Sequence, residues 1–309
     1  MITRENLIKD AIDLSLSNVN IAPIKYFNRV DLPPGFITLH LKNNEITVAQ
    51  KHDYLDPTRI NITANLIQRS TQGLNLDCKI ILNTKDEHTK FHLSIFEFAC
   101  PEDSLNIRIN DPHSSFYVGK NFFDPTPFDL KEDSLVFRGT DTGKLNEQLT
   151  NQRIEFCKNT ASVEHINSKI SQFLNHNKEA FDYMGYDIDL IAGDYLDKEA
   201  HFKYKYILDM YGHTSAWDRN FWALGSNSVL CHMKPNEIPK LLWYYRYIQK
   251  EGIVPEFTED EFINKDHTKI NIKEVKEKQK SFSKILLEPE THEEYCRTLL
   301  LEYNKLYNE

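Results

Sequence analysis

Short runs of apolar residues recur along the chain, and each ends in polar or charged residues. The clearest runs cover residues 79–82, 91–98, 135–137 and 228–230. Continuous apolar runs of this length are typical of strands buried on both faces, as in a parallel sheet covered by helices. We therefore expect a strand at each of these places. Residues 202–206 instead alternate aromatic and lysine side chains, which predicts a strand that begins near the surface before it enters the core.

Two other segments show the three- and four-residue spacing of a helix with one apolar face. The first is marked by Val163, Ile166, Ile170 and Phe173. The second begins with a capping-box pattern of Thr291 and Glu294. Its apolar stripe consists of Tyr295, Leu299, Tyr303 and Leu306. Strands that alternate with helices predict an α/β fold.

The length of 309 residues is enough for two domains, at roughly 100 to 200 residues each. The stretch from residue 112 to residue 127 is polar and contains three prolines, which predicts irregular chain. We interpret it as a linker that separates a first domain at residues 1–127 from a second domain at residues 128–309.

Composition and charge narrow the class of protein. Hydrophobic residues make up 40% and aromatic residues 12%, so most of the chain can form packed cores. No apolar run approaches the roughly 20 residues of a membrane span, and the N-terminus lacks the pattern of a secretory signal, so we expect a cytoplasmic protein. The net charge of −9 disfavours nucleic acid as the partner but leaves room for a local basic pocket that binds one nucleotide. The five cysteines include no C-x-x-C pair, which indicates reduced, structural thiols.

Candidate chemistry lies where the predicted strands end, because ligands of open α/β sheets bind beyond the carboxyl ends of the strands. Asp86 follows the run at residues 79–82 and is either a general base or a helix-capping residue. The Arg138-Gly139-Thr140 segment combines a cation, a residue that allows close backbone approach and a hydroxyl, which suits a diphosphate, although Arg-Gly pairs are also common in turns.

The segment from Tyr211 to Arg219 offers small residues that could open a helix, with backbone N–H groups facing an anion and Arg219 one turn into the helix. The alternative interpretation is a plain strand-to-helix turn with a surface ion pair.

Two further features have simpler explanations. Asp187 and Asp189 match the D-x-D pattern of metal-dependent sugar transferases, but in an acidic chain a solvated loop is the favoured interpretation. The lysine-rich residues 265–284 would suit a peripheral contact with the inner face of an anionic membrane. The interspersed Glu274 and Glu277 favour a solvated helix face instead.

Several of these segments carry a family likeness. Residues 80–86 are similar to a strand that ends in Asn-x-Arg-Asp, and residues 136–140 to a Phe-Arg-Gly-Ser signature with Thr140 in place of serine. Residues 201–229 are similar to a long signature that begins Lys-Tyr-Lys-Tyr, and residues 294–305 to a closing helix. In this order they resemble glycosyltransferase family 90, which includes capsule-associated and lipopolysaccharide-modifying transferases of microbes and protein O-glucosyltransferases of animals. The likeness extends from about residue 37 to residue 307.

The resemblance implies a GT-B architecture, in which two Rossmann-like domains face each other across a cleft and the C-terminal helix packs back. It also implies inverting transfer of a hexose or pentose from a UDP-sugar to a hydroxyl of a lipopolysaccharide or capsule glycan, without a required metal or other cofactor. The N-terminal domain would bind this glycan or glycolipid acceptor, and Asp86 would be the catalytic base. The UDP-binding residues that it implies are Arg138, Gly139, Thr140, Arg153, Thr214, Ser215, Ala216, Trp217 and Arg219.

Two other functions remain open. One is a non-catalytic relative that binds a nucleotide or a glycan, and the retention of both Asp86 and Arg219 argues against it. The other is a metal-dependent transferase that uses Asp187 and Asp189.

Overall fold

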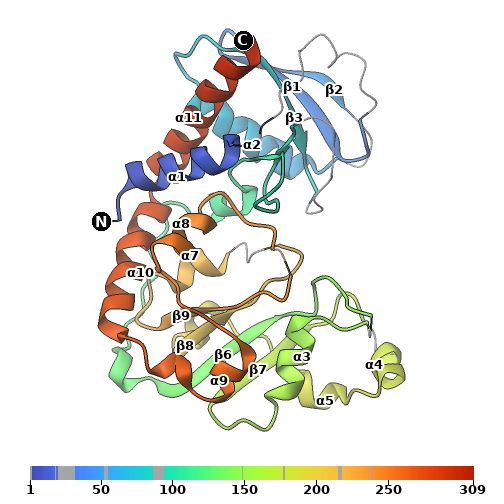
Figure 1. The fold of residues 1–309 in the computed structure, drawn as a ribbon, viewed down its shortest axis with the longest axis vertical. Helices are drawn as coiled ribbons and strands as arrows, with labels where there is room; N and C mark the ends of the chain where they lie inside the picture. The colour runs from blue at the N-terminus through green and yellow to red at the C-terminus, as the bar shows by residue number, and fades with distance from the viewer. Residues whose placement is uncertain are drawn as a thin grey trace. The chain divides into compact units, whose positions relative to one another are not determined.

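The computed structural model describes residues 2–17, 19, 32–51, 55–85, 94–147, 149–176, 178–214, 218–237 and 239–309. The chain divides into two compact units (Figure 1). Unit 1 comprises residues 1–119, 239–247 and 285–309, and unit 2 comprises residues 120–238 and 248–284. The first change of unit, after residue 119, falls within the proline-containing stretch at residues 112–127. Unit 1 also takes two later segments of the chain, which a single boundary at residue 127 does not anticipate.

Unit 1 contains a mixed five-stranded sheet with the strand order β2-β1-β3-β4-β5. Strand β1 pairs antiparallel with both β2 and β3, whereas β3, β4 and β5 are parallel. The turn between β1 and β2 consists of Asn43 and Asn44, which both have positive φ, as asparagine tolerates in a tight hairpin. The strands are β1 (Phe36–Lys42), β2 (Glu45–Lys51), β3 (Asp77–Asn83), β4 (Phe96–Glu97) and β5 (Ile107–Arg108).

The helices of unit 1 join distant parts of the sequence. They are α1 (Arg4–Leu16), α2 (Pro57–Ser70), the 3₁₀ helix η2 (Pro112–Phe116) and α11 (Pro289–Asn308), together with the first residues of α8 (Tyr245–Lys250). Helix α11 packs against α1, α2 and β3. Figure 1 shows α11 in red beside the blue N-terminal helices. The predicted stripe is confirmed at Tyr295, Leu299 and Tyr303, which are buried, whereas Leu306 is exposed.

The predicted capping box at the start of this helix is wrong. Helix α11 begins at Pro289, with Glu288 at the N-cap and no side-chain capping bond. Proline is favoured in the first turn of a helix because it has no N–H group to leave unpaired. Thr291 therefore lies inside the first turn, where it is buried, and does not cap the helix.

Unit 2 contains a parallel five-stranded sheet with the order β10-β9-β8-β6-β7. Its strands are β6 (Glu132–Thr140), β7 (Ile166–Gln172), β8 (Tyr204–Asp209), β9 (Val229–Met233) and β10 (Glu256–Phe257). The connecting helices are α3 (Gln152–Asn159), α4 (Lys178–Met184), α5 (Ile188–Ile191), α6 (Lys198–His201), α7 (Arg219–Ala223) and α9 (Glu259–Ile263). The helices before β6 and after α9 are η3 (Phe128–Leu130), η4 (Asp266–Thr268) and α10 (Ile272–Leu287).

Strand β7 occupies the segment for which the apolar spacing predicts a helix, so that prediction is wrong. Ile166, Ser168 and Ile170 are buried and the residues between them are partly exposed, which is the two-residue alternation of a strand. Ile166 and Ile170 satisfy both a two-residue and a four-residue spacing. The decisive inward position between them is the polar Ser168, whose hydroxyl is paired with that of Thr160 at 2.7 Å.

The chain is thus an α/β protein, and the strands predicted at residues 79–82, 135–137 and 228–230 are confirmed within β3, β6 and β9. The run at residues 91–98 contributes β4, and its residues 91–93 lie outside the described part of the chain. Unit 2 is compatible with a Rossmann-like fold. Within the described residues, every helix is too short or too polar to cross a membrane.

Candidate functional site

The carboxyl ends of β6 and β8 form the most distinctive edge of the unit 2 sheet. From β6 the chain moves to β7 on one side, and it then crosses to β8 on the other side. Ligands of open α/β sheets bind beyond the carboxyl ends of the strands at a reversal of this kind. Strand β6 ends at Thr140 and β8 at Asp209, so the residues that follow them lie at this edge.

Arg153 spans the gap between these two strand ends. Its Nη1 donates to the Thr140 carbonyl at 3.2 Å, on the β6 side. On the β8 side, Nη2 donates to the Met210 carbonyl at 2.7 Å and Nε to the Tyr211 carbonyl at 3.1 Å. The side chain comes from the first turn of α3, whose N-cap Asn151 accepts the Arg153 N–H at 3.1 Å. The guanidinium is therefore fixed from both strands and from its own helix.

Arg219 lies on the same edge and is held in a similar way. Its Nη1 donates to the Leu208 carbonyl at 3.0 Å and pairs with Asp209 Oδ1 at 3.3 Å, and its Nη2 donates to the Arg138 carbonyl at 2.6 Å. Its Nε is buried and has no hydrogen-bond acceptor among the described residues. As far as the described residues go, one donor of this guanidinium thus remains available to a ligand.

The two guanidinium groups share one apolar neighbour and repel each other. The Cζ atoms of Arg153 and Arg219 lie 6.0 and 5.2 Å from the centre of the Phe137 ring. Burial, and after it the charge of Arg219, lowers the pKa of Arg153 to about 10, while the carboxylates of Asp209 and Asp141 act in the opposite direction. Desolvated cations that repel each other are stabilised by a bound anion.

Two glycines allow this close packing. A Cβ atom at Gly139 would lie 2.6 Å from Cζ of the Phe137 ring, and one at Gly212 would lie 3.0 Å from Nη2 of Arg153. The first glycine belongs to the predicted Arg-Gly-Thr segment. The second follows β8 and lies within the predicted segment from Tyr211 to Arg219.

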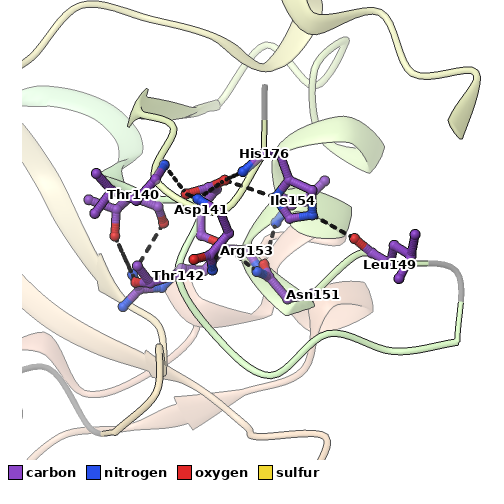
Figure 2. Close-up of polar contacts among 10 residues, drawn as sticks. Thr140, Asp141, Thr142, Leu149, Asn151, Arg153, Ile154 and His176 are labelled. Carbon is purple, nitrogen blue, oxygen red and sulfur yellow. Dashed lines mark hydrogen bonds and ion pairs between the residues drawn. The ribbon is translucent and has the colours of Figure 1, made fainter. Parts of the chain in front are cut away.

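Behind Arg153 lies a polar network that the sequence analysis missed (Figure 2). Asp141 directly follows β6 and is fully buried. Its carboxylate accepts the backbone N–H groups of residues 174–176 and pairs with Nδ1 of His176 at 2.8 Å. Its carbonyl accepts Nδ2 of Asn151 at 2.7 Å, and Asn151 in turn caps α3. In the sequence, this network is marked by the spacing of its residues: Asn151 lies ten residues after Asp141 and two residues before Arg153.

Asp209 is the counter-charge of the edge. It is buried at the end of β8, between Arg219 and His232, whose Nε2 lies 3.6 Å from Asp209 Oδ2. Burial lowers the pKa of His232 to about 4, with the charge of Arg219 acting in the same direction. His232 is thus neutral at pH 7 and adds no positive charge to this edge.

The structure brings together only some of the predicted donor-site residues. Thr140, Arg153 and Arg219 meet at the carboxyl edge, and Gly139 lies over Phe137. Arg138 contributes its carbonyl there, whereas its guanidinium bonds to Asn167 and to the Asp194 carbonyl. Thr214 is buried, and its carbonyl accepts the N–H of Gly212 at 2.9 Å. Asp86, Ser215, Ala216 and Trp217 lie outside the described residues.

The predicted position of Arg219 within its helix is wrong. Helix α7 starts at Arg219 itself, after Asp218 at the N-cap, so the side chain does not lie one turn in. Because α7 has only five residues, the charge at this edge comes from side chains and not from a long helix dipole.

The candidate metal ligands have a local role. Asp187 is the N-cap of α5, and its Oδ1 accepts the N–H of Asp189 at 3.0 Å. Over the part of the chain that the structure describes, no group of three or more histidine, cysteine or acidic side chains is placed to hold a metal ion.

Comparison of the chain with models of known protein families and with the sequences of curated proteins gave no match.

Proposed function

We propose that this chain is an inverting glycosyltransferase of the GT-B type, similar to family 90. It transfers a hexose or pentose from a UDP-sugar to a hydroxyl of a lipopolysaccharide or capsule glycan, in the cytoplasm and without a required metal. In this proposal the two units face each other across a cleft, unit 1 binding the acceptor and unit 2 the donor.

The observation that carries the proposal is the pair of guanidinium groups at the carboxyl edge of a parallel sheet, of which that of Arg153 is buried and that of Arg219 partly buried. Among the described residues, Asp209 is the one carboxylate that forms an ion pair with either Arg153 or Arg219. The two guanidinium groups therefore have one ion-paired carboxylate between them, at the place where α/β sheets bind ligands. The diphosphate of a sugar nucleotide supplies the matching negative charge.

The reaction follows from this charge and from the role that the resemblance gives to Asp86. The Asp86 carboxylate takes the proton of the acceptor hydroxyl while the hydroxyl oxygen attacks the anomeric carbon. The bond from the anomeric carbon to the diphosphate breaks, and UDP leaves with the electron pair. Fixed cations stabilise the negative charge that builds on the departing diphosphate more than the charge of the bound donor, which is the condition for catalysis.

Arg219→Ala tests the donor site. We expect UDP affinity to fall by about 10- to 150-fold, the loss of a charge-assisted contact worth about 1.5–3 kcal/mol. Isothermal titration with UDP and with uridine measures the effect, and uridine should bind weakly to both proteins because it lacks the diphosphate. Lys269→Ala is the matched control, because it removes one positive charge from an exposed position of the same unit.

Arg219 also bonds to β6 and β8, so a melting curve of the variant must accompany the titration. A folded Arg219→Ala protein with wild-type UDP affinity would contradict the donor site. UDP binding without release of UDP from any UDP-sugar would favour the non-catalytic relative.

Asp86→Asn tests the catalytic base. The substitution keeps the size of the side chain and removes its proton acceptor, so turnover should fall by about 10²–10⁴-fold. UDP affinity and melting temperature should stay at wild-type values, as should the turnover of the control Asp103→Asn. An Asp86→Asn protein that melts lower but turns over normally would show that Asp86 acts as a capping residue.

A further inference from the structure

Unit 1 contains a cavity of about 340 Å³, far in the sequence from the arginines of unit 2. It lies between α2, the segment from residue 110 to residue 118, and the first turn of α11. Much of its wall is apolar and includes Ile62, Leu66 and Val118. The volume falls within the range of small-molecule sites in proteins.

Three residues that line this cavity each keep one unpaired oxygen. They are Thr63, Asn110 and Asp111, all at least 98% buried. Their Oγ1, Oδ1 and Oδ2 atoms, respectively, are shielded from solvent and have no hydrogen-bond partner among the described residues. An unpaired buried polar atom costs about 1–3 kcal/mol. A ligand that donates hydrogen bonds would recover that free energy.

Asp111 makes this set of oxygens anionic. Its Oδ1 already accepts the N–H of Ser114 at 2.7 Å, as the N-cap of η2, so Oδ2 is the oxygen left over. Burial raises the pKa of Asp111 to about 7, which the backbone N–H groups of η2 and the charge of Arg59 partly counteract. Among the described residues no cation forms an ion pair with this carboxylate, which titrates near neutral pH.

The other charged groups around the cavity do not fill this role. Arg69 pairs with Glu293 at 2.8 Å on the exposed rim. Burial lowers the pKa of His292 to about 4, so His292 is neutral, and its Nε2 faces the Leu286 carbonyl at 2.7 Å. His113 acts on Asp111 through its backbone N–H. In the part of the chain that the structure describes, Asp111 Oδ2 thus has no positively charged partner.

We propose that this cavity binds a primary ammonium group carried on a small hydrocarbon body. The ammonium offers three N–H donors to the unpaired oxygens of Thr63, Asn110 and Asp111, and its charge pairs with the Asp111 carboxylate. The apolar walls take the hydrocarbon part. This ligand differs in charge and in location from the UDP-sugar of the proposed reaction, so the two assignments stand or fall separately.

The test uses 2-phenylethylamine and two probes of similar shape, 2-phenylethanol and 3-phenylpropanoate, titrated into the full-length protein. We expect the amine to bind at least about tenfold more tightly than the alcohol at pH 8, and the carboxylate not to bind. Amine affinity should rise about tenfold from pH 6 to pH 8, because the Asp111 carboxyl loses its proton over this range. The alkylammonium group, with a pKa of about 10, keeps its charge.

Two variants locate the binding site. Asp111→Asn keeps the capping oxygen of η2 and should abolish both the preference for the amine and its pH dependence. The exposed Asp103→Asn should leave both unchanged. Leu66→Trp fills the cavity and should abolish binding of all three probes without touching Asp111. Equal affinity for amine and alcohol, wild-type amine affinity in Asp111→Asn or Leu66→Trp, or no amine binding at millimolar concentration would each overturn the proposal.

Discussion

Arg153 illustrates how single residues build the carboxyl edge of unit 2. Its guanidinium donates to the carbonyl of the last residue of β6 and to carbonyls that follow β8, and its position depends on Asn151 at the N-cap of α3. Asn151 in turn bonds to the carbonyl of the buried Asp141. A cation held this rigidly binds an anion at little further cost in conformational entropy.

Gly212→Ala tests how closely this guanidinium is packed. The new Cβ would lie 3.0 Å from Arg153 Nη2 and 3.1 Å from its Cζ, and the guanidinium cannot retreat without losing its bonds to Met210 and Tyr211. We expect the free energy of unfolding to fall by about 1–3 kcal/mol, measured by urea denaturation.

A double-mutant cycle with Arg153→Ala is the control. If the clash with Arg153 is the cause, Gly212→Ala should cost almost nothing once the guanidinium has been removed. Equal costs in both backgrounds would show that the glycine is needed for another reason.

The sequence identified Arg153 only through the family likeness, because its neighbours along the chain carry no recognisable motif. Asp141 and Asn151 were missed for a related reason. Both residues matter through hydrogen bonds to backbone groups elsewhere in the chain: Asp141 accepts the N–H of Leu174, and Asn151 donates to the carbonyl of Asp141. The type of a side chain alone does not reveal such bonds. Arg138 was predicted to follow the strand at residues 135–137, whereas β6 continues to Thr140 and includes it. Its guanidinium bonds to Asn167 on the adjacent β7, which the Arg-Gly-Thr pattern does not indicate.

At the scale of helices and strands, the apolar patterns predicted a strand correctly where its buried positions are a continuous run of apolar residues. They predicted the wrong element where a polar residue occupies a buried position. Strands β3, β6 and β9 were predicted because their buried positions are apolar almost throughout. Strand β7 was predicted as a helix because Ser168 is buried through a hydroxyl pair with Thr160. The hydrogen bond that permits this burial is made only in the folded protein.

One hydroxyl group of helix α11 contacts both β5 and α1. The Tyr295 hydroxyl donates to the Arg108 carbonyl of β5 at 2.7 Å and lies 3.1 Å from Ser15 Oγ on α1. Tyr295→Phe keeps the ring and leaves these buried partners without that hydroxyl. We expect the free energy of unfolding to fall by about 1–3 kcal/mol in urea denaturation.

Tyr195→Phe is the matched control, since Tyr195 is 76% exposed and its hydroxyl is open to water. Its unfolding free energy should change by less than about 0.5 kcal/mol. Similar values for the two variants would mean that the Tyr295 hydroxyl does not fasten the helix.

At the scale of the whole chain, the two units are discontinuous in sequence. Residues 239–247 and 285–309 return to unit 1 after most of unit 2 has been formed. Trp243 and Tyr295, one from each returning segment, stack with their ring centres 4.3 Å apart. Local composition marks a linker at residues 112–127, but nothing local marks these returns, because they are determined by packing between residues far apart in sequence.

A chain that ends at residue 284 tests this division. It lacks α11, so the apolar surfaces of α1, α2 and β3 that pack against Tyr295, Leu299 and Tyr303 become exposed. Unit 1 should then lose its slowly exchanging amides, whereas β6, β8 and β9 in unit 2 should keep theirs, because every residue of unit 2 is still present. Hydrogen exchange read by mass spectrometry distinguishes the two units peptide by peptide.

A chain shortened only by the exposed Asn308 and Glu309 should exchange like the full-length protein. Loss of protection in both units at once would mean that they unfold as one cooperative body, and full protection of unit 1 would mean that α11 contributes little to its stability.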